Sequence, residues 1–205
     1  GTPCWVLVDC RFDLADPDWG FEEYQQVHIP GAVYAHLDDD LSGEKTPATG
    51  RHPLPPAAAF EAAAARLGIS NASQVVCYDT VGGAFAARLW WLLKYFSHAA
   101  VAVLDGGLPA WLKAGYPTQT GVEANSPGHF TARVRPELAA RLDEVETIRT
   151  SPEFVLIDAR TAERYRGEVE PIDRIAGRIP GAVNRFHALN LNADLTMKSP
   201  EQLRA

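Results

Sequence analysis

Near the start of the chain stands the stretch VLVDCR, at residues 6–11, and it returns as VLIDAR at residues 155–160. A second stretch, HIPGAV at residues 28–33, returns as RIPGAV at residues 178–183. The two matches keep their order and have offsets of 149 and 150 residues. One short match carries little weight, but two matches in order at nearly one offset indicate a duplicated domain.

The first copy alternates strand-like and helix-like segments. Short apolar runs predict buried strands at residues 5–9, 33–35, 74–78 and 101–104. Apolar residues at helical spacing predict helices at residues 57–67, 84–96 and 109–114, and the Gly- and Pro-rich stretch 41–56 predicts a loop. This alternation is typical of an α/β fold with a mainly parallel sheet flanked by helices.

The repeat also sets the expected domain boundaries. The first copy occupies residues 1–116, a Pro- and Gly-containing linker occupies 117–141, and the second copy occupies 142–205. In the second copy a helix is expected at 142–149 and a strand at 154–157, and a further helix begins at 199–204. Scaled on the first copy, about 60–70 residues of the second are missing, including its central strand. We therefore expect the 205 residues to be a fragment of a longer chain.

Composition restricts the classes of protein that fit. The 205 residues include 19 Lys and Arg against 26 Asp and Glu, a net charge of −7, and 46% hydrophobic residues. The acidic balance disfavours nucleic acid as a partner, and no apolar run approaches the roughly 20 residues of a membrane-spanning helix. Three cysteines are too few for a disulfide scaffold or a Cys-based zinc site. We expect a cytoplasmic protein without metal or cofactor and without nucleic-acid or membrane partners.

Six motifs together make a resemblance specific. They are VDCR at 8–11, VHIPGA at 27–32, LDGGLPAW at 104–111, IDAR at 157–160, ERYRGEVEP at 163–171 and GRIPGAVN at 177–184. In this combination the chain resembles the tandem rhodanese family, the thiosulfate and 3-mercaptopyruvate sulfurtransferases. The resemblance implies a duplicated rhodanese-like fold. It also implies that a cysteine of the second copy takes sulfur from a small-molecule donor as a persulfide and passes it to cyanide or a thiol.

The resemblance also locates the loop that would carry this cysteine, directly after the central strand. In the first copy the loop is YDTVGGA at residues 78–84, and Asp79 occupies the position of the cysteine. A carboxylate cannot form a persulfide, so this copy is expected to be inactive. In the second copy the cysteine would fall at about position 223–229, beyond Ala205. We therefore expect the 205-residue chain alone to have no sulfur-transfer activity.

Four basic residues are candidates for binding the donor. Arg164 matches the family's substrate-binding arginine, and a guanidinium suits a sulfonate-like or carboxylate group. The alternative for Arg164 is a structural ion pair at the domain interface. His52 resembles the histidine of a loop that reaches the active site in the mercaptopyruvate enzymes, or it is a solvated loop residue. Arg174 and Arg51 are further candidate anion ligands.

Other residues that draw attention have simpler interpretations. Asp9 with Arg11, and Asp158 with Arg160, recur in both copies, which favours a structural role because one copy lacks the cysteine. Cys77 lies inside a predicted strand and Cys10 directly follows one, so both are expected to be unreactive thiols.

Two other functions remain open from the sequence. The dual-specificity phosphatases related to rhodanese need arginine six residues after the cysteine, and none of Cys4, Cys10 and Cys77 has one. In the third reading both copies lack the cysteine, and the protein is a non-catalytic module that binds anions or a partner. The residue at the loop position of the second copy separates the three.

Overall fold

The computed structural model describes residues 4–204 of the chain, which fold into two units. Unit 1 comprises residues 4–135 together with 194–196, and unit 2 comprises residues 136–193 together with 197–204. No helix within residues 4–204 combines the length and apolar character needed to cross a lipid bilayer.

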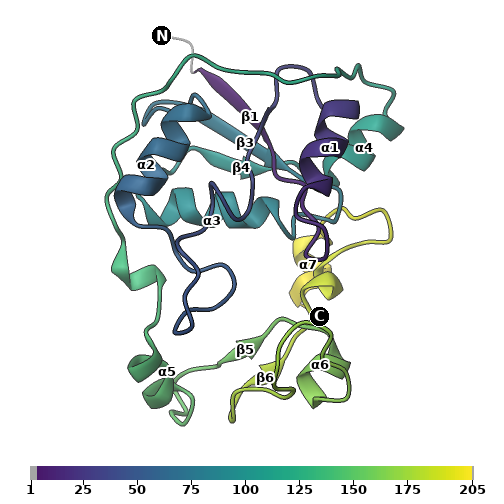
Figure 1. The fold of residues 1–205 in the computed structure, drawn as a ribbon. Coiled ribbons are helices and arrows are strands. Elements are labelled where there is room, and N and C mark those ends of the chain that lie inside the picture. The colour runs from purple at the N-terminus through teal and green to yellow at the C-terminus, as the bar shows by residue number, and fades with distance from the viewer. Residues whose placement is uncertain (1–3, 205) are drawn as a thin grey trace. The chain divides into compact units, whose positions relative to one another are not determined.

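Unit 1 is built on a parallel sheet of four strands (Figure 1). The strands lie in the order β2-β1-β3-β4 and comprise β1 (Trp5–Asp9), β2 (Val33–Tyr34), β3 (Gln74–Tyr78) and β4 (Val101–Val103). The central pair, β1 and β3, runs in register from Trp5 opposite Gln74 to Asp9 opposite Tyr78. Both of these strands have the bounds that the sequence predicted. Since they are parallel, the residues that follow Asp9 and Tyr78 meet at one edge of the sheet.

Helices cover both faces of this sheet. The helices are α1 (Trp19–Gln26), α2 (Ala57–Arg66), α3 (Ala86–Tyr95) and α4 (Gly107–Lys113), with α2 and α3 on one face and α1 and α4 on the other (Figure 1). Alternation along β1 explains the two layers. Val6 and Val8 are buried in the main core with residues of α2 and α3, whereas Leu7 packs with Leu108 of α4 in a smaller cluster. The fold is therefore an α/β layer structure with a parallel sheet flanked by helices, as the sequence predicted.

The stretch that follows α4 contributes to unit 1. Phe130 is buried in the main core and packs edge-to-face on Phe60, with ring centroids 5.7 Å apart. The backbone N–H of Ala132 donates to Glu61 of α2 at 2.7 Å. The two units divide between Arg135 and Pro136, inside the Pro- and Gly-containing stretch 117–141.

Unit 2 has a smaller sheet and a sparse core. It contains α5 (Leu142–Ile148), β5 (Ile157–Asp158), α6 (Ala162–Arg166), β6 (Val183–Asn184) and α7 (Pro200–Arg204), with 3-10 turns at Pro136–Leu138 and His187–Asn190. β5 and β6 pair in parallel. The strand predicted at 154–157 is therefore wrong in its bounds, because within residues 154–158 only Ile157 and Asp158 have a ladder partner. Phe154 and Val155 are exposed.

The same ion pair follows the first strand of each unit. In unit 1, Arg11 Nη2 lies 2.8 Å from Asp9 Oδ2, and both side chains are buried. In unit 2, Arg160 Nη2 lies 2.7 Å from Asp158 Oδ2, with Arg160 more exposed. Each arginine also donates from Nη2 to a backbone carbonyl at 2.6 Å, Val27 in unit 1 and Gly177 in unit 2. The pair thus fastens the strand end to the segment before the IPGA turn in both units.

The two aspartates have opposite pKa shifts. Burial raises the pKa of Asp9, although its hydrogen bonds to Arg11 oppose the rise. The pKa of Asp158 is lowered, because in the more open unit 2 the hydrogen bond from Arg160 outweighs desolvation. The arrangement is shared, but its surroundings differ.

A tyrosine makes a second contact that both units share. Tyr24 of α1 donates its hydroxyl to Ala32 O at 2.8 Å, and Tyr165 of α6 donates to Ala182 O at 2.7 Å. The acceptor follows the donor by eight positions in unit 1 and by 17 positions in unit 2. Unit 2 therefore has nine extra residues between the helix and the turn.

Candidate functional site

The loop after β3 encloses the carboxylate of Asp79. Asp79 Oδ1 accepts the backbone N–H groups of Val81 and Gly83, both at 2.9 Å. Asp79 Oδ2 accepts those of Phe85 at 2.8 Å and Ala86 at 2.9 Å. The side chain is buried, and the last donor is the first residue of α3. Four convergent N–H groups and a helix N-terminus form a cradle for one anion, and in unit 1 the chain supplies that anion itself.

Glycines make the tight loop possible. Gly82 and Gly83 have φ angles of 72° and 90°, which side chains with a Cβ rarely adopt. Gly107, at the start of α4, has φ 56°, and a Cβ there would lie 2.2 Å from the carbonyl oxygen of Asp79. These positions let the backbone turn inward around the carboxylate. The expected helix at 84–96 therefore begins at Ala86, because residues 84 and 85 belong to the loop.

None of the three cysteines occupies this loop position. Cys10 and Cys77 are buried in the main core, and burial raises the pKa of both thiols, that of Cys77 to about 12. Cys77 Sγ lies 3.3 Å from the carbonyl oxygens of Ala86 and Ala102. Cys4 is exposed directly before β1. A sulfur carrier needs an accessible thiolate, so the buried pair is unsuited to this role.

His52 lies in a loop of unit 1 that α3 holds in place. Its Nε2 is 3.1 Å from Asp38 Oδ1, and its ring meets Phe12 edge-on with centroids 6.3 Å apart. Arg88 of α3 donates to the carbonyl oxygens of His52 and Pro53 at 3.1 and 2.9 Å. Burial lowers the pKa of His52, and Asp38 opposes that shift. His52 is therefore a half-buried, fixed side chain rather than a freely solvated one.

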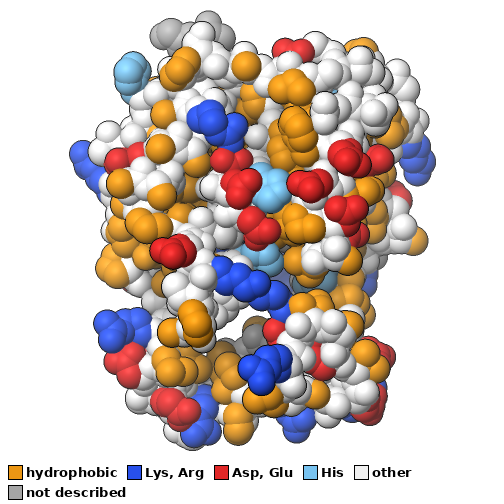
Figure 2. Space-filling model, in the orientation of Figure 1, with side chains coloured by type: hydrophobic (Ala, Val, Ile, Leu, Met, Phe, Trp, Pro, Cys, Tyr) orange, Lys and Arg blue, Asp and Glu red, His pale blue; other side chains and the backbone are white. Residues whose placement is uncertain are grey.

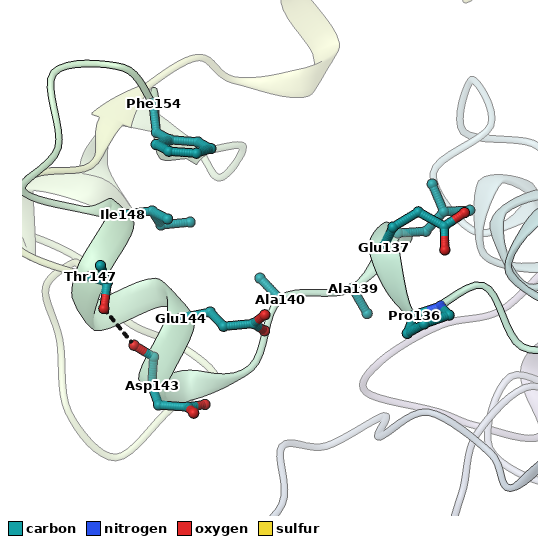
Figure 3. A pocket seen from close by; sticks show the side chains of 10 residues that line it. Pro136, Glu137, Ala139, Ala140, Asp143, Glu144, Thr147, Ile148 and Phe154 are labelled. Carbon is teal, nitrogen blue, oxygen red and sulfur yellow. Dashed lines mark hydrogen bonds between the residues drawn. The ribbon is translucent and has the colours of Figure 1, made fainter.

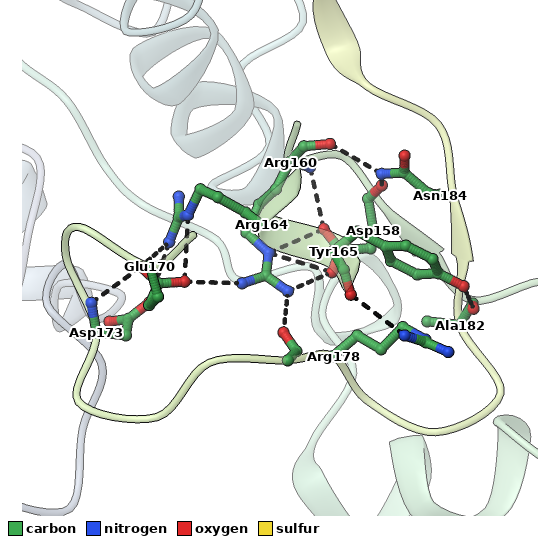
Figure 4. A network of polar contacts seen from close by, with 10 residues as sticks. Asp158, Arg160, Arg164, Tyr165, Glu170, Asp173, Arg178, Ala182 and Asn184 are labelled. Carbon is green, nitrogen blue, oxygen red and sulfur yellow. Dashed lines mark hydrogen bonds and ion pairs between the residues drawn. The ribbon is translucent and has the colours of Figure 1, made fainter. Parts of the chain in front are cut away.

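Arg164 lies in a network of ion pairs within unit 2 (Figure 4). Its Nη2 is 2.8 Å from Glu170 Oε1, and its Nε is 3.2 Å from Glu170 Oε2. Nη2 also contacts Asp173 Oδ2 at 3.2 Å. These hydrogen bonds lower the pKa of Glu170 to about 2. The acidic partners of Arg164 belong to its own unit.

The other two candidates differ in their surroundings. Arg51 is half-buried next to His52 in the loop of unit 1. Arg174 is exposed in the bend after Asp173, and it makes no hydrogen bond or ion pair with the residues of 4–204. The structure thus groups the four candidates by unit, with Arg51 and His52 in unit 1 and Arg164 and Arg174 in unit 2.

Two acidic residues near these candidates were not singled out in the sequence. Asp38 pairs with His52, and Glu170 pairs with Arg164. Glu170 stands in the ERYRGEVEP motif, and its side chain is only 4% exposed. The spacing from the tyrosine to the IPGA turn is longer in unit 2 than in unit 1, and this difference could have drawn attention to Glu170. The nearly constant offset of the flanking motifs concealed it.

A separate groove of 690 Å³ lies beside α5 (Figure 3). Its lining combines apolar side chains with acidic ones, among them Ile148, Phe154, Asp143 and Glu144. Thr147 Oγ1 donates to Asp143 O at 3.1 Å on the helix side. Acidic walls repel anions, so this groove does not suit an anionic sulfur donor. On the face drawn in Figure 2, several acidic side chains gather around a histidine.

Comparison with known proteins extends these observations. Residues 1–114 match the model of the rhodanese-like domain. The chain is 43% identical over 203 residues to the "Probable 3-mercaptopyruvate sulfurtransferase" of Pseudomonas aeruginosa, covering 98% of this chain and 72% of the relative. It is 37% identical to the human 3-mercaptopyruvate sulfurtransferase, covering 89% of this chain and 62% of the human protein. The chain thus spans about two thirds of the length of these curated relatives.

Solved structures show the same relationship. SseA from Escherichia coli, a 3-mercaptopyruvate sulfotransferase, matches with a TM-score of 0.87 and 29% identity, covering 99% of this chain and 76% of that one. The 3-mercaptopyruvate sulfurtransferase from Leishmania major matches with a TM-score of 0.83 and 31% identity, covering 98% of this chain and 56% of that one. The fold, the motifs and these relatives agree, and the chain belongs to the rhodanese family of sulfurtransferases.

Proposed function

We propose that the protein transfers sulfane sulfur from thiosulfate or 3-mercaptopyruvate to cyanide or a thiol, through a persulfide on a cysteine beyond residue 205. One observation carries this proposal: the loop after β3 is a cradle of four backbone N–H groups closed around Asp79. The same cradle around a cysteine would stabilise a thiolate and its anionic persulfide. The recurring ion pair and tyrosine contact support a duplicated domain, in which the second copy carries that cysteine.

The proposed reaction has two displacements at sulfur. The thiolate attacks the outer sulfur of thiosulfate, the S–S bond breaks, and sulfite leaves with the electron pair. With 3-mercaptopyruvate the C–S bond breaks instead, and the enolate of pyruvate leaves and takes up a proton. Cyanide or a thiolate then attacks the outer sulfur of the persulfide, which restores the cysteine thiolate. No external oxidant or reductant is needed.

Arg164 is our candidate for binding the anionic end of the donor. A guanidinium offers paired N–H groups to paired oxygens of a carboxylate or sulfonate. Arg174, exposed in the same unit, is a second candidate ligand. His52 and Arg51 are candidates from unit 1, and His52 favours 3-mercaptopyruvate because a neutral imidazole donates one hydrogen bond to a carboxylate.

The test uses the full-length protein and the 205-residue chain side by side. Each is incubated with either donor and with cyanide, and thiocyanate is measured, while mass spectrometry follows the persulfide. We expect thiocyanate and a gain of one sulfur atom only in the full-length protein, with kcat/KM deciding between the donors. Thiocyanate production by the 205-residue chain would show that the carrier cysteine has been misplaced. Absence of activity in both would favour the alternative function, a non-catalytic module that binds anions or a partner.

We also propose that the protein works in a reducing compartment such as the cytoplasm. The three free cysteines support this location.

A further inference from the structure

Glu170 is surrounded by hydrogen-bond donors. Its carboxylate receives Nε and Nη2 of Arg164, and Nη1 of Arg160 lies 3.4 Å from Oε2. The backbone N–H groups of Ile172 and Asp173 donate to Oε1 at 3.1 and 3.0 Å. The side chain is 4% exposed although it belongs to an irregular segment. A carboxylate with five donors from three directions is held in one place.

Glu170 links Arg164 to the end of β5. Asp158, the last residue of β5, fixes Arg160 through bonds to Nε and Nη2. Arg160 reaches Glu170 with Nη1, and Glu170 holds Arg164 on α6 (Figure 4). In open parallel sheets, ligands bind at the carboxyl ends of the strands, and β5 ends here. The chain of ion pairs therefore sets the position of Arg164 relative to that edge.

Comparison of the units separates this arrangement from the shared fold. The residue before the tyrosine that donates to the IPGA turn is Glu23 in unit 1 and Arg164 in unit 2. Glu170 lies in the longer loop of unit 2, which has nine residues more than its counterpart. Unit 1 has the Asp–Arg pair and the tyrosine contact, but it has neither the arginine before the tyrosine nor the longer loop. Arg164 and its carboxylate partner are therefore not required by the common architecture.

The geometry leaves part of Arg164 available. Nε and Nη2 face Glu170 and Asp173, whereas Nη1 makes no hydrogen bond with any residue of the described range 4–204. The side chain is partly exposed. A guanidinium held on one edge presents its remaining N–H groups in a fixed direction, so less conformational entropy is lost when an anion binds.

We infer that Glu170 is a positioning residue of the donor site, which holds Arg164 so that the free edge of its guanidinium receives the anionic end of the sulfur donor. This inference rests on the proposed role of Arg164. Glu170 touches neither the donor nor the reacting sulfur, and it acts through the orientation of Arg164. The extra loop of unit 2 thus tunes recognition of the donor rather than the stability of the fold.

The test is Glu170→Gln in the full-length protein, because the amide keeps the shape of the side chain and one acceptor for the backbone N–H groups. We expect KM for the donor to rise about tenfold, while kcat and the KM for cyanide stay within about twofold. The matched control is Glu168→Gln. Glu168 is on the same loop but pairs with Arg166 at 2.7 Å and is exposed, so donor KM should not change.

A second readout is independent of activity. In the wild type the Arg164 Nε–H resonance should be resolved and protected from exchange with water, and in Glu170→Gln it should broaden or shift while the Arg166 resonance does not. An unchanged donor KM in Glu170→Gln would overturn the inference. A lower donor KM would also overturn it, because it would show that Glu170 competes with the donor for Arg164. Inactivity of the wild type would instead refute the proposed function, and the resonances would then still show whether Glu170 orders Arg164.

Discussion

The carboxylate of Asp79 accepts the backbone N–H of Ala86, the first residue of α3, at 2.9 Å. The bond closes a loop in which a buried negative charge faces the positive end of a helix dipole. Unit 1 therefore has an anion cradle whose ligand is one of its own side chains. A site that is filled by its own side chain contributes to stability, and we expect it to take no sulfur donor.

Replacing Asp79 with alanine should destabilise unit 1 by about 3 kcal/mol or more, because four backbone N–H groups lose the buried carboxylate that accepts from them. Urea unfolding monitored by tryptophan fluorescence measures this selectively. All five tryptophans belong to unit 1: Trp5, Trp19, Trp90, Trp91 and Trp111. Asp13→Ala is the control, since Asp13 is exposed and accepts one N–H, from Ala15. Equal losses in the two variants would refute the role of the cradle.

Replacing Asp79 with cysteine tests the electrostatics of the same loop. A thiolate at this position would face four N–H groups and the start of α3, so its pKa should fall below the usual value of about 8.5 by one unit or more. Cysteine-specific ultraviolet absorbance over a pH titration measures it, with Cys4, Cys10 and Cys77 changed to alanine in the background. A pKa at or above that of a free thiol would show that the cradle does not stabilise a sulfur anion.

The native thiols should react unequally. Burial raises the pKa of Cys77 to about 12 and that of Cys10 well above its usual range, whereas Cys4 is exposed. An aromatic disulfide reagent at mildly alkaline pH should therefore modify about one thiol quickly, and all three after denaturation. Loss of the fast phase in Cys4→Ser would show that Cys4 is the thiol that reacts quickly. Rapid reaction of Cys77 in the folded protein would contradict its burial and reopen a role in sulfur transfer.

The central sheet of unit 1 was predictable because its strands are short apolar runs of the right length. The helix α1 (Trp19–Gln26) was missed, since only Gly20 and Tyr24 are buried on it and no apolar stripe marks it. In unit 2, the predicted strand at 154–157 shrank to Ile157–Asp158, because strand assignment depends on a partner. A sequence pattern predicts which residues are buried, but it does not show which residues find a hydrogen-bonded partner strand.

Asp79 could be placed by alignment with the loop of the family, whereas its four N–H contacts depend on backbone geometry. The partners of Arg164 were hidden for a different reason. Unit 1 has more residues between its first strand and α1, and unit 2 has more between α6 and the IPGA turn. The two differences nearly cancel, so the offset between the flanking motifs stays almost constant and masks the longer loop that holds Glu170.

The buried ion pair of unit 1 should be far more sensitive than a surface pair. Arg11→Met should cost about 3–5 kcal/mol, because Asp9 would remain buried without its partner. Arg66→Met is the control in the same unit, since Arg66 is exposed and its pair with Asp40 should contribute about 1 kcal/mol or less. Both are measured by urea unfolding with tryptophan fluorescence. Similar losses for the two variants would show that Asp9 gains solvent or another partner.

His52 gives unit 1 a defined response to pH. Burial lowers its pKa below the usual 6.5, so the unfolded chain binds the proton more readily, and the stability it contributes above about pH 6.5 is lost as the pH falls through the lowered value. His52→Gln should therefore flatten the decline in unfolding free energy between about pH 7 and 5. Asp38→Asn should lower the pKa of His52 further, because the carboxylate of Asp38 favours the imidazolium. Urea unfolding over this pH range measures the first effect, and NMR titration of the His52 imidazole in the wild type and in Asp38→Asn measures the second. A His52 pKa above 6.5 would contradict the burial of this loop.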